Sequence, residues 1–221
     1  MKANQINSVP VSYFFIQKHS AIIRLWHWLT FIVISGIIIT VLINSTIMNP
    51  RGNVAMVQEQ LKSKGATVTE EQAFSVSHEY EDKFWNVHKL LGYGLTFLVI
   101  SRIIIEIAEH VEEKISSRIK NALGLYRQND GGKNEYRHYL RVKTGYLLFY
   151  ILVLFMALTG LGLAFGRNLG FSRELHGAIK EIHSLGQYLM YAFIALHIGG
   201  VIIGENSKIG GIVSGMINGN K

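Results

Sequence analysis

The sequence predicts an all-α, integral membrane four-helix bundle with both termini in the cytoplasm. Three observations predict it: four long runs nearly free of charge, an uneven distribution of basic residues between connecting segments, and too little polar sequence to cover four apolar helices in water. The chain has 221 residues and is 49% hydrophobic and 17% charged, whereas soluble domains carry about 25% charged residues. We expect residues 1–221 to form one membrane domain.

The four apolar runs are the expected membrane spans, and each has about 19–25 residues, enough to cross a hydrocarbon core of roughly 30 Å. Backbone groups in lipid must be paired within the segment, so each run should be helical. The first run is too long for a cleaved signal peptide and lacks a small-residue cleavage site. The third has no charged side chain and no histidine, and is expected to pack through its small residues. The spans are residues 25–43, 84–108, 146–165 and 183–203.

Lys and Arg are distributed unevenly between the connecting segments. Residues 1–24, 109–145 and 205–221 hold three, eight and two of them, while residues 44–83 and 167–182 hold four and three. The segment 44–83 also carries six acidic residues. Cytoplasmic segments are enriched in Lys and Arg, so both termini and the inner loop 109–145 are expected inside, and the outer loop 44–83 outside. The net charge of +7 therefore reflects membrane topology and does not indicate nucleic-acid binding.

Several kinds of chemistry are excluded by composition. The chain has no cysteine, which excludes disulfides, thiolate-bound iron–sulfur clusters and a cysteine nucleophile. The Gly131–Lys133 stretch lacks the first glycine and the hydroxyl residue of a phosphate-binding loop. No catalytic residue is predicted.

Histidines inside the spans are the strongest functional signal, because ionisable groups in a membrane are costly and usually mark a site. Four of the nine histidines lie in or at the edge of a span: His27, His88, His183 and His197. With a cytoplasmic N-terminus, the direction of each helix places His27 and His197 near the inner face. The same reasoning places His88 and His183 near the outer face. The sequence thus predicts two histidine pairs at two depths.

The spacing on the fourth span supports this interpretation. His183 and His197 are fourteen residues apart, which is roughly 21 Å along a helix and about 40° short of whole turns. Both rings should therefore point from nearly the same face. Two neutral imidazoles on facing helices can hold a haem iron from both sides. With both axial positions filled, the iron is suited to exchanging single electrons.

Histidines in membrane helices also serve purposes other than haem ligation. A single membrane histidine is as often a hydrogen-bonding helix contact as a ligand. A zinc site needs three or four ligands at one point; His176 and His183 could contribute, but the separation of His183 from His197 argues against it. A proton relay would need carboxylates at mid-depth, which the spans lack. His78 and His176, near the outer face, are expected to be solvated loop residues, with proton exchange as the alternative.

Two glycines follow candidate ligands at helical spacing. Gly92 comes four residues after His88, and Gly186 three after His183. A small residue one turn from a ligand leaves room for a porphyrin plane, and close packing between helices accounts for it equally well.

Two arginines are candidates for contact with a haem propionate. Arg102 follows His88 by fourteen residues and is expected at the depth of the inner pair, where it could pair with a propionate or hydrogen-bond to helix ends. Arg24 precedes His27 by three residues, and for it the role of an interfacial anchor is favoured.

The chain resembles the prokaryotic cytochrome b561 superfamily, especially the b-type cytochrome subunits of nickel–iron hydrogenases and their stand-alone relatives. The resemblance covers nearly the whole chain outside residues 44–83 and 109–135. It is carried by four stretches: "IRLWHWLTFIVISGIIIT" (Ile23–Thr40), "FWNVHKLLGYGLTFLVISR" (Phe84–Arg102), "REL" with "IHSLGQYLMYAFIALHIGGVIIGEN" (Ile182–Asn206), and "GGIVSGMINGNK" (Gly210–Lys221).

The resemblance implies a four-helix, usually dihaem cytochrome b in the bacterial inner membrane, with haem b held at His27, His88, His183 and His197. Single-haem members also exist. It implies electron transfer between a quinone or quinol and a partner across the lipid bilayer. Two alternatives remain open: an anchor and relay subunit for a hydrogenase- or molybdoenzyme-like complex, with the partner docked at the outer face, or a stand-alone superoxide:quinone-type oxidoreductase.

Overall fold

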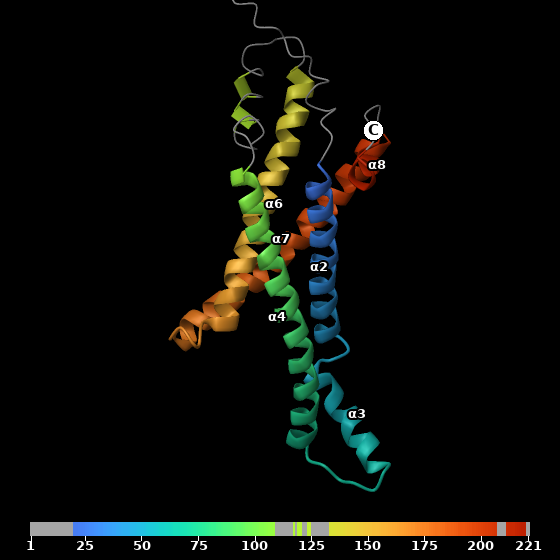
Figure 1. Ribbon diagram of the computed structural model, residues 1–221. Coiled ribbons are helices and arrows are strands. Elements are labelled where there is room, and N and C mark those ends of the chain that lie inside the picture. The colour runs from blue at the N-terminus through green and yellow to red at the C-terminus, as the bar shows by residue number, and fades with distance from the viewer. Residues whose placement is uncertain are drawn as a thin grey trace, which may run out of the picture. The chain divides into compact units, whose positions relative to one another are not determined.

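The structure is a computed structural model that describes residues 20–108, 117, 119–120, 123–124, 133–206 and 211–219. Within these ranges the regular secondary structure is helical, and no strand occurs (Figure 1). The helices are α2 (Ala21–Ser45), α3 (Pro50–Lys62), α4 (Glu70–Ala108), α6 (Lys133–Phe165), α7 (Arg173–Glu205) and α8 (Ile212–Ile217).

Four of these helices, α2, α4, α6 and α7, are long and apolar enough to cross a membrane. Their large apolar side chains are mostly exposed: Leu196 is 77%, Ile203 74% and Phe97 70% exposed. Exposed apolar surface of this extent is unfavourable in water and suits contact with lipid. The predicted all-α class with four membrane helices is confirmed, and the orientation of the termini stays a prediction.

The long helices extend beyond the apolar runs that predicted them. Helix α4 begins fourteen residues before the expected span 84–108, and α6 begins thirteen residues before 146–165. Most of the expected outer loop 44–83 is helical, because α3 and the first turns of α4 occupy it. The difference has a simple cause. Apolar runs mark only the part of a helix that suits lipid, whereas caps decide where the helix ends.

Polar caps set the ends of α3 and α4. The Asn49 side chain accepts a hydrogen bond from the Gly52 backbone amide at 3.1 Å, with Pro50 in the first helical turn. At α4, Thr69 and Gln72 form a reciprocal capping box: each side-chain oxygen accepts from the other's backbone amide, at 2.9 and 3.2 Å. The capping box thus sets the start of α4 at residue 70, well before its apolar segment.

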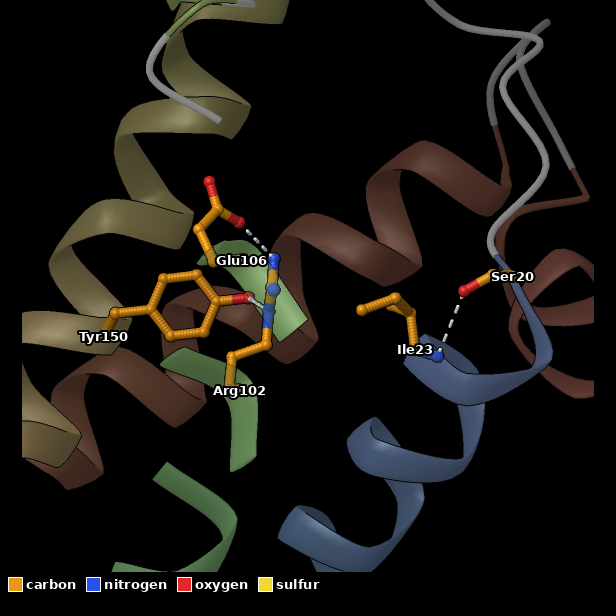
Figure 2. A network of polar contacts seen from close by, with 5 residues as sticks. All are labelled: Ser20, Ile23, Arg102, Glu106 and Tyr150. Carbon is orange, nitrogen blue, oxygen red and sulfur yellow. Dashed lines mark hydrogen bonds and ion pairs between the residues drawn. The ribbon is translucent and has the colours of Figure 1, made fainter. Parts of the chain in front are cut away.

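The starts of α2 and α7 use serine in the same way. The Ser20 hydroxyl accepts from the Ile23 amide at 3.3 Å (Figure 2), and Ser172 accepts from the Leu175 amide at 3.1 Å. The turn between α6 and α7 passes through Gly170 with φ of +78°, a left-handed conformation that favours glycine.

The helices contribute to two compact units. The first, which we call the α8 unit, comprises the described parts of residues 1–26, 99–156 and 180–221. The second, the α3 unit, comprises residues 27–98 and 157–179. Helices α2, α4, α6 and α7 each contribute a segment to both units, and each unit is described by itself below.

Candidate functional site

In the α3 unit, Thr40 and Trp85 contact the imidazole of His88. Its Nδ1 lies 3.0 Å from the Thr40 hydroxyl oxygen, and that oxygen also lies 2.6 Å from the Ile37 carbonyl oxygen. The ring of Trp85, one turn earlier on α4, meets the imidazole edge-on with 5.3 Å between ring centroids. Thr40 is buried at 5% exposure and His88 is half-buried. The imidazole therefore has a defined orientation between α2 and α4.

Open space lies beside Gly92, one turn beyond His88. Apart from its chain neighbours and the nearby backbone of its own helix, a Cβ built at Gly92 would meet no described atom within 4 Å. The same holds for Gly94. By contrast, Gly36 on α2 lies against the Leu91 side chain, 3.0 Å from a built Cβ. Gly36 thus allows α2 to pack closely against α4. The role of Gly92 in leaving room for a porphyrin stays a prediction.

The other histidines of the α3 unit differ in setting. His27 is half-buried on α2 with the Trp28 ring edge-on at 5.3 Å. His78 is half-buried on α4, and its Nδ1 lies 3.3 Å from the Asp82 carboxylate one turn on. His176 lies on α7, where its Nε2 is 3.3 Å from the Leu163 carbonyl oxygen. His78 and His176 are thus on helices, and no function is assigned to them.

In the α8 unit, His197 belongs to an aromatic cluster. Its ring is stacked on Phe193, one turn earlier on α7, with 6.2 Å between centroids and 7° between planes. Phe193 stacks in turn on Phe149 of α6 at 5.2 Å. Trp26 of α2 meets Phe149 at 6.5 Å and Tyr150 at 5.9 Å. Three helices therefore place aromatic rings around the segment that carries His197.

The α8 unit also contains a buried polar network on α4 and α6. Arg102 is 7% exposed; its Nε donates to the Tyr150 hydroxyl at 3.0 Å and one Nη donates to the Glu106 carboxylate at 2.8 Å (Figure 2). Arg102 was a sequence candidate, and Tyr150 was not. The i,i+4 spacing of Arg102 and Glu106 could have indicated their contact, but nothing local relates Arg102 to Tyr150, 48 residues away.

Gly186 has a packing role in the α8 unit. A Cβ built there would lie 2.6 Å from the Met156 sulfur and 2.8 Å from a Phe155 ring carbon, and Gly186 is buried. Close approach of α7 to α6 requires glycine at this position. His183, one turn earlier, is half-buried on α7. Of the two roles expected for Gly186, the structure supports close packing; a role beside porphyrin stays a prediction.

Arg24 lies against the C-terminal segment of the α8 unit. A Cβ built at Gly219 would collide with the Arg24 guanidinium, and Gly219 has φ of +78°. The Glu205 carboxylate accepts from the backbone amides of Gly211 and Val213 at 3.2 and 3.1 Å, which ties α8 to the end of α7. These contacts place Gly219 beside α2 and the start of α8 beside the end of α7.

Each predicted histidine pair has one member in either unit: His27 and His88 belong to the α3 unit, and His183 and His197 to the α8 unit. The pairing stays a prediction. Among the described residues, no three His, Cys, Asp or Glu side chains gather as a metal-binding group. The candidate ligands are imidazoles at separate positions on the membrane helices. This donor set suits a haem iron, which needs only two axial ligands from the protein.

Membrane helices that carry imidazoles at separate positions are compatible with the class of integral membrane haem proteins. A family model described as prokaryotic cytochrome b561 matches residues 18–219, nearly the whole chain. The chain belongs to this family, and it is a transmembrane b-type cytochrome of electron transfer that binds haem b. No curated protein and no solved structure matches the chain significantly.

Proposed function

We propose that this chain is a dihaem cytochrome b of the bacterial inner membrane that transfers single electrons between a quinone or quinol and a redox partner. In this proposal His27 and His197 hold the inner haem, and His88 and His183 hold the outer one. The observation that carries it is the placement of four histidines on three membrane helices at two expected depths.

Helix continuity supports the separation of the two haems. Helix α7 runs without interruption from Arg173 to Glu205 and includes both His183 and His197. The fourteen residues between them therefore correspond to roughly 21 Å along one axis. Two haems held at these positions would thus be separated along α7 by a distance that the helix backbone sets.

The chain's own residues hold the groups and set their surroundings. Haem iron with two imidazole ligands supplies one-electron redox chemistry. The four histidines would supply imidazole nitrogens as ligands, and His27, His88 and His183 are half-buried whereas His197 is exposed. Arg102, whose guanidinium donates to Glu106 and Tyr150 in this structure, is proposed to pair also with a propionate of the inner haem. Arg24 is proposed to lie at the inner face as well, as a second candidate partner for a haem propionate.

The decisive experiment counts haems and removes them one at a time. A dithionite-reduced spectrum with a pyridine haemochromogen assay should give two haems b per chain. His88→Ala and His197→Ala should each lose one haem, and EPR of the oxidised variants should show that the lost haems differ. One haem per wild-type chain, or loss of the same haem in both variants, would contradict the two-pair proposal.

The outer extension favours a second candidate, an anchor and relay subunit for a larger complex. Helix α3 and the first fourteen residues of α4 lie outside the expected spans. Ala73 and Ser77 in this part of α4 are buried at 1% and 4% exposure, so the extension is packed against other residues. Mild solubilisation and purification of the full chain from its native membrane would discriminate: a stoichiometric redox subunit favours the anchor. Quinol oxidation by the isolated cytochrome favours independent action.

A further inference from the structure

The hydroxyl of Thr40 lies between two groups that could each share its proton. Its oxygen is 2.6 Å from the Ile37 carbonyl oxygen and 3.0 Å from Nδ1 of His88. The contact to the carbonyl is local to α2, whereas the contact to His88 joins residues 48 positions apart. Thr40 is buried, so bulk water does not compete for either bond.

The number of protons available determines which group donates in each of the two hydrogen bonds of Thr40. A carbonyl oxygen can only accept, so at 2.6 Å the single hydroxyl proton of Thr40 points to Ile37. The hydroxyl oxygen must then accept from His88, which places the imidazole proton on Nδ1. In a neutral imidazole the other nitrogen, Nε2, then carries the lone pair. This is the tautomer in which Nε2 can act as a metal ligand.

We propose that Thr40 is a positioning residue for His88, fixing the imidazole tautomer and ring direction that bind the outer haem. The proposal rests on the proposed function, because it takes His88 as an axial ligand. The edge-on ring of Trp85 restricts the imidazole from a second side. An acceptor at Nδ1–H also increases the basicity of the ligand nitrogen. Greater basicity stabilises ferric iron and lowers the midpoint potential of the haem.

The test compares three variants of the full-length haem-loaded chain. Thr40→Val removes the hydroxyl and keeps the branched shape, whereas Thr40→Ser keeps the hydroxyl. Thr30→Val is the matched control: Thr30 lies on the same helix, is equally buried at 3% exposure, and makes no hydrogen bond through its hydroxyl within the described residues. Measurements are haem transfer to apomyoglobin, potentiometric titration, and EPR g-values of each low-spin haem.

Thr40→Val should weaken retention of the haem that depends on His88 by about 10–100-fold, the usual effect of losing a partner of a metal ligand. The midpoint potential of that haem should rise, and its g-values should change. Thr40→Ser should restore all three properties, and Thr30→Val should leave that haem as in the wild type. The other haem should keep its potential in every variant.

Two negative results are distinguishable. If His88→Ala loses a haem but Thr40→Val keeps wild-type retention, potential and g-values, the positioning role is wrong and the proposed function stands. If His88→Ala retains both haems, His88 is not a haem ligand, and the proposed ligand pair of the outer haem is wrong. If Thr40→Val does not fold, Thr40→Ala and Thr40→Ser make the same comparison, and equal behaviour of these two overturns the proposal.

Discussion

The two units support their histidines in different ways. In the α3 unit, His88 is bonded to a neutral hydroxyl and flanked by one indole. In the α8 unit, His197 stacks on Phe193 of an aromatic cluster, and an ion pair between the buried Arg102 and the half-buried Glu106 lies on α4 of the same unit. One unit thus orients an imidazole by a directional bond between neutral groups. The other combines ring packing with buried charge.

This difference has consequences for stability and for redox tuning. A bond between neutral groups contributes modestly to stability but determines which nitrogen carries the proton. A buried ion pair becomes costly when one partner is removed, since the remaining charge stays in a medium of low polarity. Substitutions in the α8 unit should therefore affect folding most. Substitutions beside His88 should affect the cofactor most.

The largest expected effect is in the α8 unit. Arg102→Met should lower the free energy of unfolding by about 2–4 kcal/mol, because it leaves the half-buried Glu106 carboxylate without the Arg102 cation. Reversible unfolding in mixed micelles, followed by helicity, measures the change. The double variant Arg102→Met/Glu106→Gln should recover part of the loss. Arg51→Met, on exposed α3, is the control and should change stability little. Wild-type stability in Arg102→Met would contradict the role of the pair.

The next largest effect should be a difference between the two units in how much a Gly→Ala substitution lowers stability. Gly186→Ala should cost about 1–3 kcal/mol, since its Cβ would meet Met156 and Phe155 at less than 3.0 Å. Gly162→Ala in the α3 unit is the matched variant, because its Cβ would meet Ile179 at an ordinary 3.5 Å. It should be neutral or slightly stabilising, as alanine favours helix. The same unfolding assay measures both, and equal costs would remove this distinction.

Gly92→Ala tests whether a porphyrin lies beside α4. The protein itself has room for the methyl group, so the helix alone should tolerate it or gain up to about 1 kcal/mol. If the outer haem packs on Gly92, its retention should fall about tenfold, equivalent to about 1.4 kcal/mol. Gly94→Ala, equally open but about 200° around the helix, should retain haem normally. Equal retention in the two variants would place the porphyrin elsewhere.

The smallest expected effect concerns the ring stack in the α8 unit. Phe193→Leu should remove the stacking contact with His197, worth about 0.5–1.5 kcal/mol. EPR should show altered g-values for the haem that depends on His197, with the other haem unchanged. Phe97→Leu is the control, since Phe97 is 70% exposed. An unchanged spectrum in Phe193→Leu would show that the stack does not orient the imidazole.

The sequence by itself determined the membrane helices, the family and the candidate ligands. Lipid allows only internally bonded backbone, so an apolar run of sufficient length defines a helix without knowledge of its neighbours. The histidines stood out because an ionisable group is conspicuous in such a run. The ends of the helices were predicted less well. The outer part of α4 is polar and begins at the capping box of Thr69 and Gln72.

Only the tertiary structure decided what the candidate residues contact. Thr40 with His88, and Arg102 with Tyr150, are each 48 positions apart, and no helical periodicity relates residues on different helices. Gly92 and Gly186 were equivalent in the sequence, yet one has open space and the other lies against α6. Spacing along one helix follows from backbone geometry, which is local. Contact between helices depends on how their side chains pack, and that is a property of the folded chain.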